Sequence, residues 1–355
     1  MLLEKLSNAR GVSGDESAVR ALIAAHLQKH VDEYRVDALG NILAVKRASK
    51  RGARAPFRIL VAAHMDEVGF LITHIDRDGL LRFEKIGGID DRILPAQTVL
   101  IGAQAVPGVI GLKPRHLSTE SERKQVVAAD ALRIDLGASG RADAQRVITP
   151  GAYATFATQF STFGDNCARG KALDDRAGCA LLCELVRENF PFDLYAVFTT
   201  QEEIGLRGAR VAGHAVAPNA ALVLEATICD DASIRSRARA AQSFPPRAQA
   251  PITQLGAGPA LTLADRRLLA HKGLTRAIAE TARAEKIPFQ YKQPLVGSTD
   301  AGILHRVRGG VPSAVLSVPA RYIHSPAAVI SLDDFQNALK LARAALPKFA
   351  DALDA

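Results

Sequence analysis

The stretch that decides the fold is FRILVAAHMD, residues 57–66, in which an almost continuously apolar run leads directly into His64 and Asp66. A short apolar run of this kind is typical of a strand that is buried on both faces, as in the centre of a parallel sheet. Open α/β sheets bind their ligands at the carboxyl ends of such strands. We therefore expect residues 57–63 to form a central strand whose end carries polar functional groups.

Helices and strands alternate along the rest of the chain, which is typical of a mostly parallel sheet sandwiched by helices. The residues 13–16, Ser-Gly-Asp-Glu, have the form of a capping box that opens a first helix, and a second such box begins at Ser331. We expect strands over 34–36, 42–46, 193–200, 220–225, 289–292 and 313–318, and helices over 176–188, 205–214 and 265–285.

The pattern changes between Gly69 and Ala168, where turn signals such as Asp78-Gly79 and Pro107-Gly108 follow one another closely. Closely spaced turns between short alternating segments indicate a β-rich module. Within it, the polar residues 115–131 predict an exposed loop or short helix. The fold class is therefore α/β, with residues 1–68 and 169–355 forming one domain and residues 69–168 forming an inserted small β-barrel-like domain.

Composition and charge exclude several classes of protein. The 355 residues are 48% hydrophobic, and no apolar run approaches the roughly 18 residues that span a bilayer. The N-terminal MLLEKL carries an acid and no cleavage site, so we expect no signal peptide. The four cysteines form no CxxC pair, and we expect buried free thiols at Cys179 and Cys183 and a cytoplasmic location.

The net charge of +8 raises the question of nucleic-acid binding. Aromatic residues make up only 5% of the chain and tryptophan is absent, which leaves little material for stacking bases. The densest basic clusters lie at residues 46–54 and 235–239, and we expect both to be solvated loops. We therefore expect neither a nucleic-acid nor a membrane partner.

Acidic and imidazole side chains gather at the predicted carboxyl ends of the strands and just beyond them. They are His64 with Asp66, Asp174 with Asp175, Glu202 with Glu203, Glu225, and His324. Each group alone is compatible with a surface turn or a helix cap, but at one sheet edge they would converge. A set of carboxylates and imidazoles without thiolates suits hydrolytic zinc, cobalt or manganese rather than structural zinc. On one strand face, Asp66 can reach behind the imidazole of His64 and orient it.

Eight sequence strings occur in an order that covers nearly the whole chain. They are AHMDEVGF (63–70), KIGGIDDRIL (85–94), GVIGLKPRHL (108–117), RIDLGA (133–138), GKALDDRAG (170–178), TTQEEIGLRGA (199–209), GSTDAG (297–302) and RYIHSP (321–326). With them the chain resembles the M42 family of metallo-aminopeptidases, the glutamyl and leucyl aminopeptidases of the tetrahedral type, within the clan of co-catalytic zinc exopeptidases.

The resemblance implies two divalent metal ions per subunit, zinc or cobalt with manganese as an alternative. It assigns His64 and Glu225 to one ion, Glu203 and His324 to the other, Asp174 as the bridge, Glu202 as the general base acting on a metal-bound water, and Asp66 as the group that orients His64. The chain departs from the family pattern at two positions. Glu225 stands where the family more often has Asp, and Ser298 replaces a glycine.

The resemblance further implies hydrolysis of the N-terminal residue from peptides with a free N-terminus. It also implies dimerisation through the inserted domain and assembly of the dimers into a dodecamer. Two alternatives stay open at this point. One is an N-acyl amino acid deacylase or carboxypeptidase of the same clan, and the other is a non-catalytic assembly protein that retains the fold.

Overall fold

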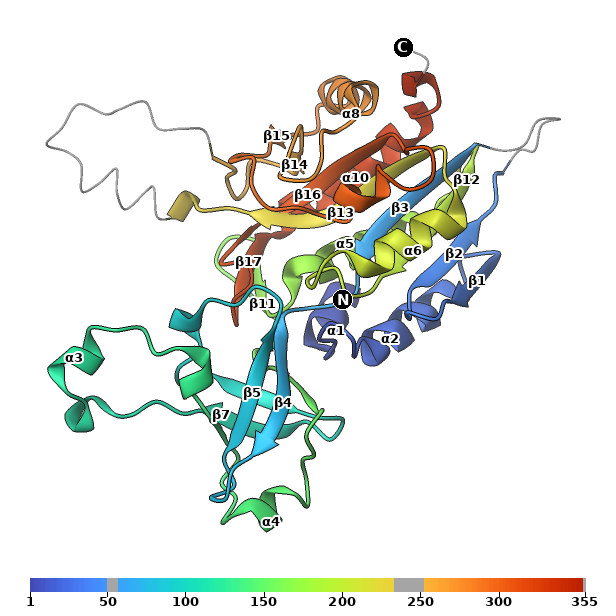
Figure 1. Cartoon of the computed structure of the whole chain (residues 1–355). Helices are drawn as coiled ribbons and strands as arrows, with labels where there is room; N and C mark the ends of the chain where they lie inside the picture. The colour runs from blue at the N-terminus through green and yellow to red at the C-terminus, as the bar shows by residue number, and fades with distance from the viewer. Residues whose placement is uncertain (50–56, 233–251, 354–355) are drawn as a thin grey trace, which may run out of the picture.

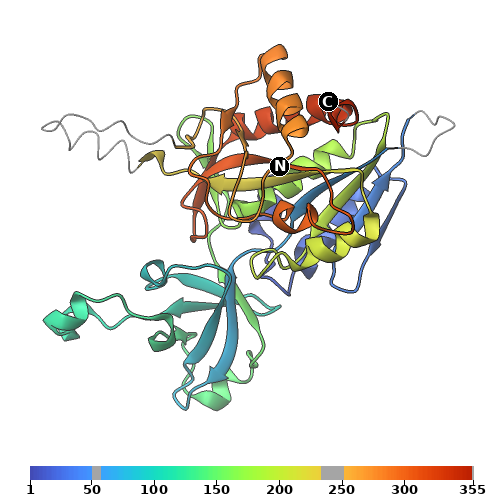
Figure 2. The same ribbon diagram turned by 45° about the horizontal axis from the view of Figure 1, so that its top comes forward.

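A computed structural model of the chain describes residues 1–49, 57–232 and 252–353. Figure 1 shows an α/β body with a β-barrel below it, and Figure 2 shows the same two parts from a second direction. The chain leaves the α/β body after the third strand, builds the barrel and then returns, so one body is interrupted by the other.

The α/β body is built on a mixed sheet in the order β1-β2-β12-β3-β13-β16-β17-β11-β10, with β14 and β15 added beside β16. The strands are β1 (Glu33–Val36), β2 (Ile42–Lys46), β3 (Arg58–His64), β10 (Ser161–Phe163), β11 (Cys167–Gly170), β12 (Asp193–Thr199), β13 (Ala220–Ile228), β14 (Ala260–Leu261), β15 (Gln290–Tyr291), β16 (Ser313–Arg321) and β17 (Ala328–Ser331). The four central strands β12, β3, β13 and β16 are parallel, whereas the flanking strands on both sides are antiparallel.

Strand β3 occupies the centre of this sheet, as the apolar run predicts. Its alternate residues enter two cores, because successive side chains of a strand point to opposite faces. Ile59 and Val61 pack into the larger core with α1, α2, α5, α8 and α10, and Leu60 packs into the second core with α6 and α9. The expected sandwich of helices around a sheet is therefore confirmed.

The helices of the α/β body are α1 (Leu2–Asn8), α2 (Ser17–Leu27), α5 (Leu173–Leu185), α6 (Arg207–Val216), α8 (Lys272–Ala284), α9 (Ala301–Leu304) and α10 (Leu332–Ala345), followed by the 3-10 turns η4 (Leu346–Lys348) and η5 (Asp351–Leu353). The predicted start of the last helix is confirmed, because the Ser331 hydroxyl accepts a hydrogen bond from the Asp334 N–H at 3.3 Å.

Two expectations about helix starts are wrong. The residues 13–16 do not cap α2, because the Ser13 hydroxyl donates to Asp66 and the Glu16 carboxylate accepts from the Gly14 and Gln201 N–H groups. The helix expected from residue 265 begins only at Lys272. The Asp265 side chain accepts hydrogen bonds from two N–H groups just after it and forms a turn there.

The inserted body is a closed barrel in the order β4-β5-β8-β7-β6-β9. Its elements are β4 (Gly69–Ile75), β5 (Leu81–Ile86), η1 (Asp91–Ile93), β6 (Thr98–Ile101), β7 (Val106–Ile110), η2 (Arg115–Leu117), α3 (Glu120–Arg123), η3 (Ala129–Ala131), β8 (Ile134–Asp135), α4 (Arg141–Ala144) and β9 (Tyr153–Phe156). It has its own core, in which Phe70 meets Phe83 and Phe156 edge to face. After β9 the chain rejoins the large sheet through β10 and β11.

The polar segment 111–131, called the arm below, projects from the barrel and carries η2, α3 and η3 (Figure 1). Its side chains are mostly exposed, in agreement with the sequence. All four cysteines are free thiols, and Cys179 and Cys183 are buried as expected.

Two further expectations are tested only in part. No helix among the described residues is both long and apolar enough to cross a membrane. Of the basic clusters, Lys46 and Arg47 lie at the end of β2 and beyond it, and Arg47 pairs with Glu33 and Asp193. The remaining basic residues of both clusters, Lys50, Arg51, Arg54, Arg235, Arg237 and Arg239, lie outside the described residues.

A buried ionic cluster joins the N-terminal segment to β3 and α5. The Glu67 carboxylate lies 2.7 Å from Lys171 Nζ and 3.2 Å from an Arg176 guanidinium nitrogen. Arg176 also donates to the carbonyls of Leu6 and Met65. Burial lowers the pKa of Lys171 to about 8, and the charge of Glu67 opposes that shift.

Replacing Glu67 with glutamine leaves two buried cations without their counter-charge. We expect Glu67→Gln to lower the free energy of unfolding by about 3–5 kcal/mol, because removing one partner of a buried ionic group has that cost. Urea unfolding followed by circular dichroism measures the change. The control is Glu120→Gln, whose ion pair with Lys124 is exposed, and which should behave like the parent protein. Equal effects of the two substitutions would contradict the prediction.

Candidate active site

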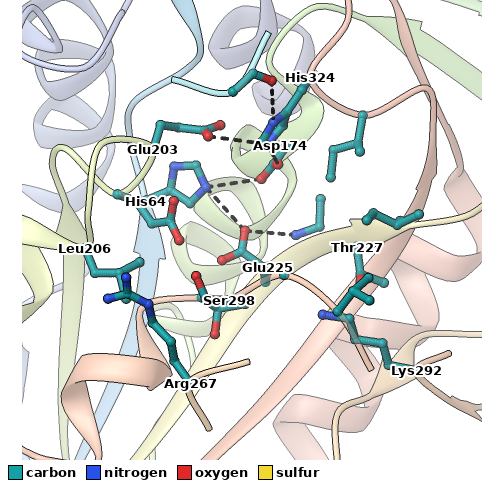
Figure 3. A pocket seen from close by; sticks show the side chains of 18 of the residues that line it. His64, Asp174, Glu203, Leu206, Glu225, Thr227, Arg267, Lys292, Ser298 and His324 are labelled. Atoms are coloured by element: carbon teal, nitrogen blue, oxygen red, sulfur yellow. Dashed lines mark hydrogen bonds and ion pairs between the residues drawn. The ribbon is translucent and has the colours of Figure 1, made fainter. Parts of the chain in front are cut away.

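The predicted polar residues meet at the carboxyl edge of the parallel strands. His64 is the last residue of β3, Glu202 and Glu203 follow β12, and His324 follows β16. Glu225 lies inside β13 rather than at its end, because that strand continues to Ile228. Figure 3 shows these side chains around one cavity of about 430 Å³.

Asp174 stands at the centre of this group. Its Oδ1 lies 3.1 Å from His64 Nε2, and its Oδ2 lies 3.2 Å from His324 Nε2. On the outer sides, Glu225 Oε1 lies 3.3 Å from His64 Nε2 and Glu203 Oε2 lies 3.3 Å from His324 Nε2. One carboxylate thus faces two imidazoles, and each imidazole has a second carboxylate of its own.

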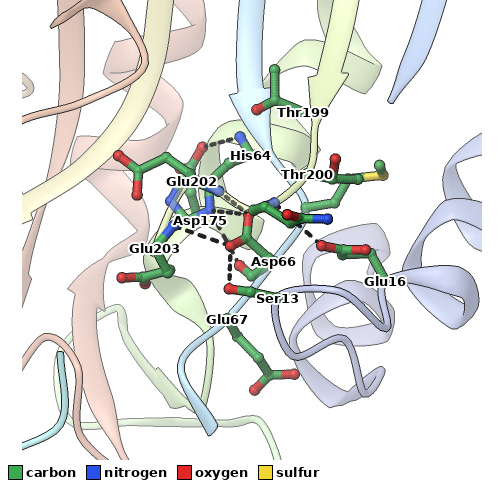
Figure 4. Close-up of polar contacts among 12 residues, drawn as sticks. Ser13, Glu16, His64, Asp66, Glu67, Asp175, Thr199, Thr200, Glu202 and Glu203 are labelled. Atoms are coloured by element: carbon green, nitrogen blue, oxygen red, sulfur yellow. Dashed lines mark hydrogen bonds and ion pairs between the residues drawn. The ribbon is translucent and has the colours of Figure 1, made fainter. Parts of the chain in front are cut away.

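Asp66 is buried behind this group and binds four partners (Figure 4). Its Oδ1 accepts the Glu202 N–H at 3.0 Å and lies 3.3 Å from His64 Nδ1. Its Oδ2 accepts the Glu203 N–H at 3.1 Å and the Ser13 hydroxyl at 2.6 Å. Asp66 therefore fixes both the ring of His64 and the backbone that carries the two glutamates.

The two aspartates at the start of α5 have separate roles. Asp174 faces the cavity, whereas the buried Asp175 turns toward the protein and accepts hydrogen bonds from the Gly178 and His64 N–H groups. A Cβ on Gly178 would lie 2.4 Å from an Asp175 carboxylate oxygen, so the close approach requires glycine at this position. The capping alternative from the sequence thus applies to Asp175 and not to Asp174.

His324 is oriented from the barrel. Its Nδ1 lies 3.1 Å from the carbonyl oxygen of Gly88, which follows β5. A Cβ on Gly88 would lie 3.3 Å from the same nitrogen, so a larger residue would crowd the ring. His324 itself has a φ of +57°, a conformation that costs free energy for a residue other than glycine and that is typical of functional sites.

Glu202 differs from the other acids of the site. Among the described residues its carboxylate forms no hydrogen bond or ion pair, although it lines the cavity next to Glu203. Burial raises the pKa of Glu202 well above its ordinary value, and the nearby charge of Glu225 adds to this shift. A carboxylate that is held by its backbone and free at its side chain can accept and release a proton.

The acids of the cluster are buried close together, so added positive charge would stabilise their charged forms. Burial raises the pKa of Glu225 to about 8 and that of Glu203 to about 7. Burial also opposes the charge of Asp174, but hydrogen bonds from His324 and His64 hold its pKa well below the usual range. Hydrogen bonds and neighbouring acids raise the pKa of His324 to about 9, although burial acts against this. Without cations, the site can retain its carboxylates in the charged form only by protonating its histidines.

The donor set fits divalent metal ions. Ligand atoms of His64, Asp174 and Glu203 all lie within 4.8 Å of one another, and so do those of His64, Asp175 and Glu225. Imidazole nitrogens and carboxylate oxygens are ligands of zinc, cobalt and manganese, and no thiolate takes part. A site of this composition in a cavity that opens to the surface suits metal-assisted hydrolysis.

The sequence did not identify several residues that shape this site. Ser13 was assigned to a helix cap, and Gly88 lies in the inserted domain far along the chain from His324. Arg267 and Lys292 line the cavity without belonging to any of the quoted strings. Gly88 lies in the quoted string KIGGIDDRIL, but nothing in the sequence connects it with His324, and no local signal separates Ser13, Arg267 and Lys292 from ordinary surface or loop positions.

Comparisons with known proteins agree with the fold and the site. A family model described as M42 glutamyl aminopeptidase matches residues 40–341. The lysyl aminopeptidase of Pyrococcus furiosus is 33% identical over 97% of this chain and 96% of its own. The solved TET aminopeptidase of a marine sediment Thaumarchaeota archaeon is 34% identical, with a TM-score of 0.90 over 99% of this chain and 98% of its own. The TET1 peptidase of Pyrococcus horikoshii, described as assembling into a tetrahedron or a large octahedral shell, is 31% identical, with a TM-score of 0.83 over 97% of each chain.

The chain therefore belongs to the M42 glutamyl aminopeptidase family. It is a hydrolase of peptide bonds of the metallo-aminopeptidase type. Family membership favours this activity over the deacylase, carboxypeptidase and non-catalytic alternatives.

Asp66→Asn tests how far this residue organises the site. Each carboxylate oxygen accepts a backbone N–H, so either orientation of the asparagine amide places its NH₂ group against a donor. We expect the affinity for Zn²⁺ or Co²⁺ to fall about ten- to a hundredfold, as for other residues that orient a ligand. Calorimetric titration of the metal-free protein with either ion gives the value.

The matched control is Asp130→Asn, at an exposed position of the arm. It should bind metal as the parent protein does. An unchanged affinity in Asp66→Asn would show that the ligands are positioned without this carboxylate.

Proposed function

We propose that the protein removes N-terminal residues from peptides with two divalent metal ions per chain, zinc or cobalt, with manganese as an alternative. His64 and Glu225 would hold one ion and Glu203 and His324 the other, with Asp174 shared between them. The observation that carries this proposal is the position of Asp174, whose two oxygens lie 3.1 and 3.2 Å from the two imidazoles. A single carboxylate between two nearly symmetrical ligand sets is suited to bridging a pair of ions.

The charges of the set support the same assignment. Asp174, Glu203 and Glu225 supply three negative charges, and both histidines are neutral when they bind metal. Two divalent ions would reverse the net charge of the cluster to +1. When bound, they would polarise the scissile carbonyl and lower the pKa of water.

Glu202 is the general base in this proposal. Its carboxylate lines the cavity and has no competing partner among the described residues, while Asp66 fixes its backbone. It would take a proton from the attacking water and deliver it to the departing amine. A metal ion together with the nearby carboxylates would give the α-amino group of a free N-terminus a place to bind, which would direct attack to the first peptide bond.

The adjacent glutamates provide a matched pair of variants. We expect Glu202→Gln to retain two ions per chain while kcat falls about a hundred- to ten-thousandfold, because general acid–base catalysis contributes about that factor. We expect Glu203→Gln to bind fewer ions, because it loses a ligand. Metal content by mass spectrometry and turnover of leucyl- and glutamyl-p-nitroanilide separate the two effects. Full activity in Glu202→Gln would refute its role as the base, and unchanged metal content in Glu203→Gln would refute its role as a ligand.

Self-association is the second part of the proposal. The arm exposes Leu112, Leu117 and Val126, with exposed fractions of 50%, 63% and 59%. Exposed apolar residues of this size on one projecting segment are typical of a protein interface, and the TET1 relative forms closed assemblies. We infer that the arm joins two copies of this chain into a dimer, the building block of a dodecamer.

Leu117→Glu should weaken this contact by placing a charge in an apolar interface. We expect light scattering after gel filtration to show a dodecamer for the parent protein and a smaller species for the variant. Val36→Glu, at an exposed apolar position on β1 in the other body, is the control and should keep the parent mass. A parent protein that is monomeric at micromolar concentration would refute the inference.

A further inference from the structure

The cavity has a basic side as well as an acidic one. Lys292 follows β15, and Arg267 lies in the loop between β14 and α8. Figure 3 shows both across the cavity from Glu203 and His324, with Glu225 between the two groups. Thr227 and Ser298 contribute hydroxyl groups to the lining. The cavity therefore carries its acids and histidines at one end and two cationic side chains at the other.

Lys292 is buried and has no partner among the described residues. Only 5% of the residue is exposed, yet its ammonium group forms no hydrogen bond or ion pair with the residues that the structure describes. Burial lowers the pKa of Lys292, and the charges of Asp265 and Glu225 oppose that shift. Lys171 is also buried, with 1% of the residue exposed, but Glu67 and a backbone carbonyl bind it. A buried cation without a partner is costly, which marks Lys292 as a group with an external partner.

The Lys292 ammonium group lies beside the loop that carries Ser298. A Cβ placed on Gly297 would lie 3.9 Å from Lys292 Nζ, so the lysine tip rests close to this backbone. Gly297 has a φ of +79° and its carbonyl accepts the Arg266 N–H at 3.1 Å. The lysine tip therefore lies next to the backbone of the turn that carries Ser298.

We propose that Lys292 binds the side-chain carboxylate of an acidic first residue, so that the enzyme prefers peptides that begin with glutamate or aspartate. The proposal rests on the aminopeptidase function proposed above. The α-amino group of the substrate would bind at the end of the cavity where the metal ions are proposed, and the rest of the peptide must leave through the opening of the cavity. The enclosed Lys292 then meets the side chain of the first residue. The exposed Arg267 adds positive charge on the same side.

Family membership does not decide this preference. The family description names glutamate, whereas the relative from Pyrococcus furiosus is named for lysine. Lys292 and Arg267 would attract a first residue of negative charge and repel one of positive charge.

The experiment compares glutamate with glutamine, which differ in charge but hardly in shape, and adds an apolar and a basic first residue. The probes are the p-nitroanilides of glutamate, glutamine, leucine and lysine, with the purified, metal-loaded protein. These probes have no free carboxyl terminus, so an effect of Lys292 reports on the side chain of the first residue. Because a charge-assisted hydrogen bond is lost, we expect kcat/KM for the glutamyl probe to exceed that for the glutaminyl probe about ten- to a hundredfold.

Three variants locate the effect. Lys292→Met should reduce the ratio of glutamyl to glutaminyl kcat/KM to near one, with the change mostly in KM. Lys292→Glu should make kcat/KM for the lysyl probe higher than kcat/KM for the glutamyl probe. A purely structural role of Lys292 would not produce this reversal. Arg266→Met, an exposed neighbour outside the cavity lining, should leave the ratio unchanged. Inhibition of the parent protein by free glutamate should be stronger than inhibition by free glutamine.

The outcomes separate this inference from the function on which it rests. Cleavage of none of the four probes with zinc, cobalt or manganese would refute the proposed function itself. If the leucyl or lysyl probe is cleaved but kcat/KM for the glutamyl probe does not exceed that for the glutaminyl probe, the proposed function stands and the role of Lys292 is overturned. A glutamyl preference that survives Lys292→Met would also overturn it.

Discussion

The site depends on the carboxylate of Asp66 and on the four groups that surround it. Two backbone N–H groups, one hydroxyl and one imidazole converge on its two oxygens. These partners come from the N-terminal loop, the end of β3 and the turn after β12, so a single buried charge sets the relative positions of three segments. A buried carboxylate is stable in the charged form only when donors surround it. The same requirement that satisfies Asp66 therefore also fixes His64, Glu202 and Glu203.

The sequence predicted the parts of the fold that follow from local pattern. The apolar run before His64 predicts a strand covered by helices on both faces, and β3 does pack into a hydrophobic core on each face. Local pattern failed where a side chain has a distant partner. Ser13 and Glu16 have the spacing of a helix cap, but they bind Asp66 and Gln201 instead, more than fifty residues away along the chain. The contacts that decide between a helix cap and these distant hydrogen bonds exist only after the sheet has formed.

A similar limit applies to the site. The acids and histidines at strand ends were predictable because parallel strands bring their carboxyl ends to one edge. Asp174 and Asp175 could be told apart only through the family resemblance and not from local pattern, since their different directions depend on the backbone at the start of α5. Lys292 lies beside a two-residue strand, with no motif around it. Its importance follows from burial and from the lack of a partner among the described residues, and neither property is visible in a linear chain.

The hydrogen bond between Gly88 and His324 joins the barrel to the α/β body at the candidate active site. Gly88 belongs to the inserted barrel, whereas His324 follows a strand of the α/β body. With Nδ1 engaged as a donor, the imidazole has a fixed tautomer and Nε2 keeps its lone pair for a ligand. A rotation of the barrel against the sheet would turn this ring away. The inserted domain thus contributes a contact to the candidate active site, so a contact that shifts the barrel would also act on the imidazole of His324.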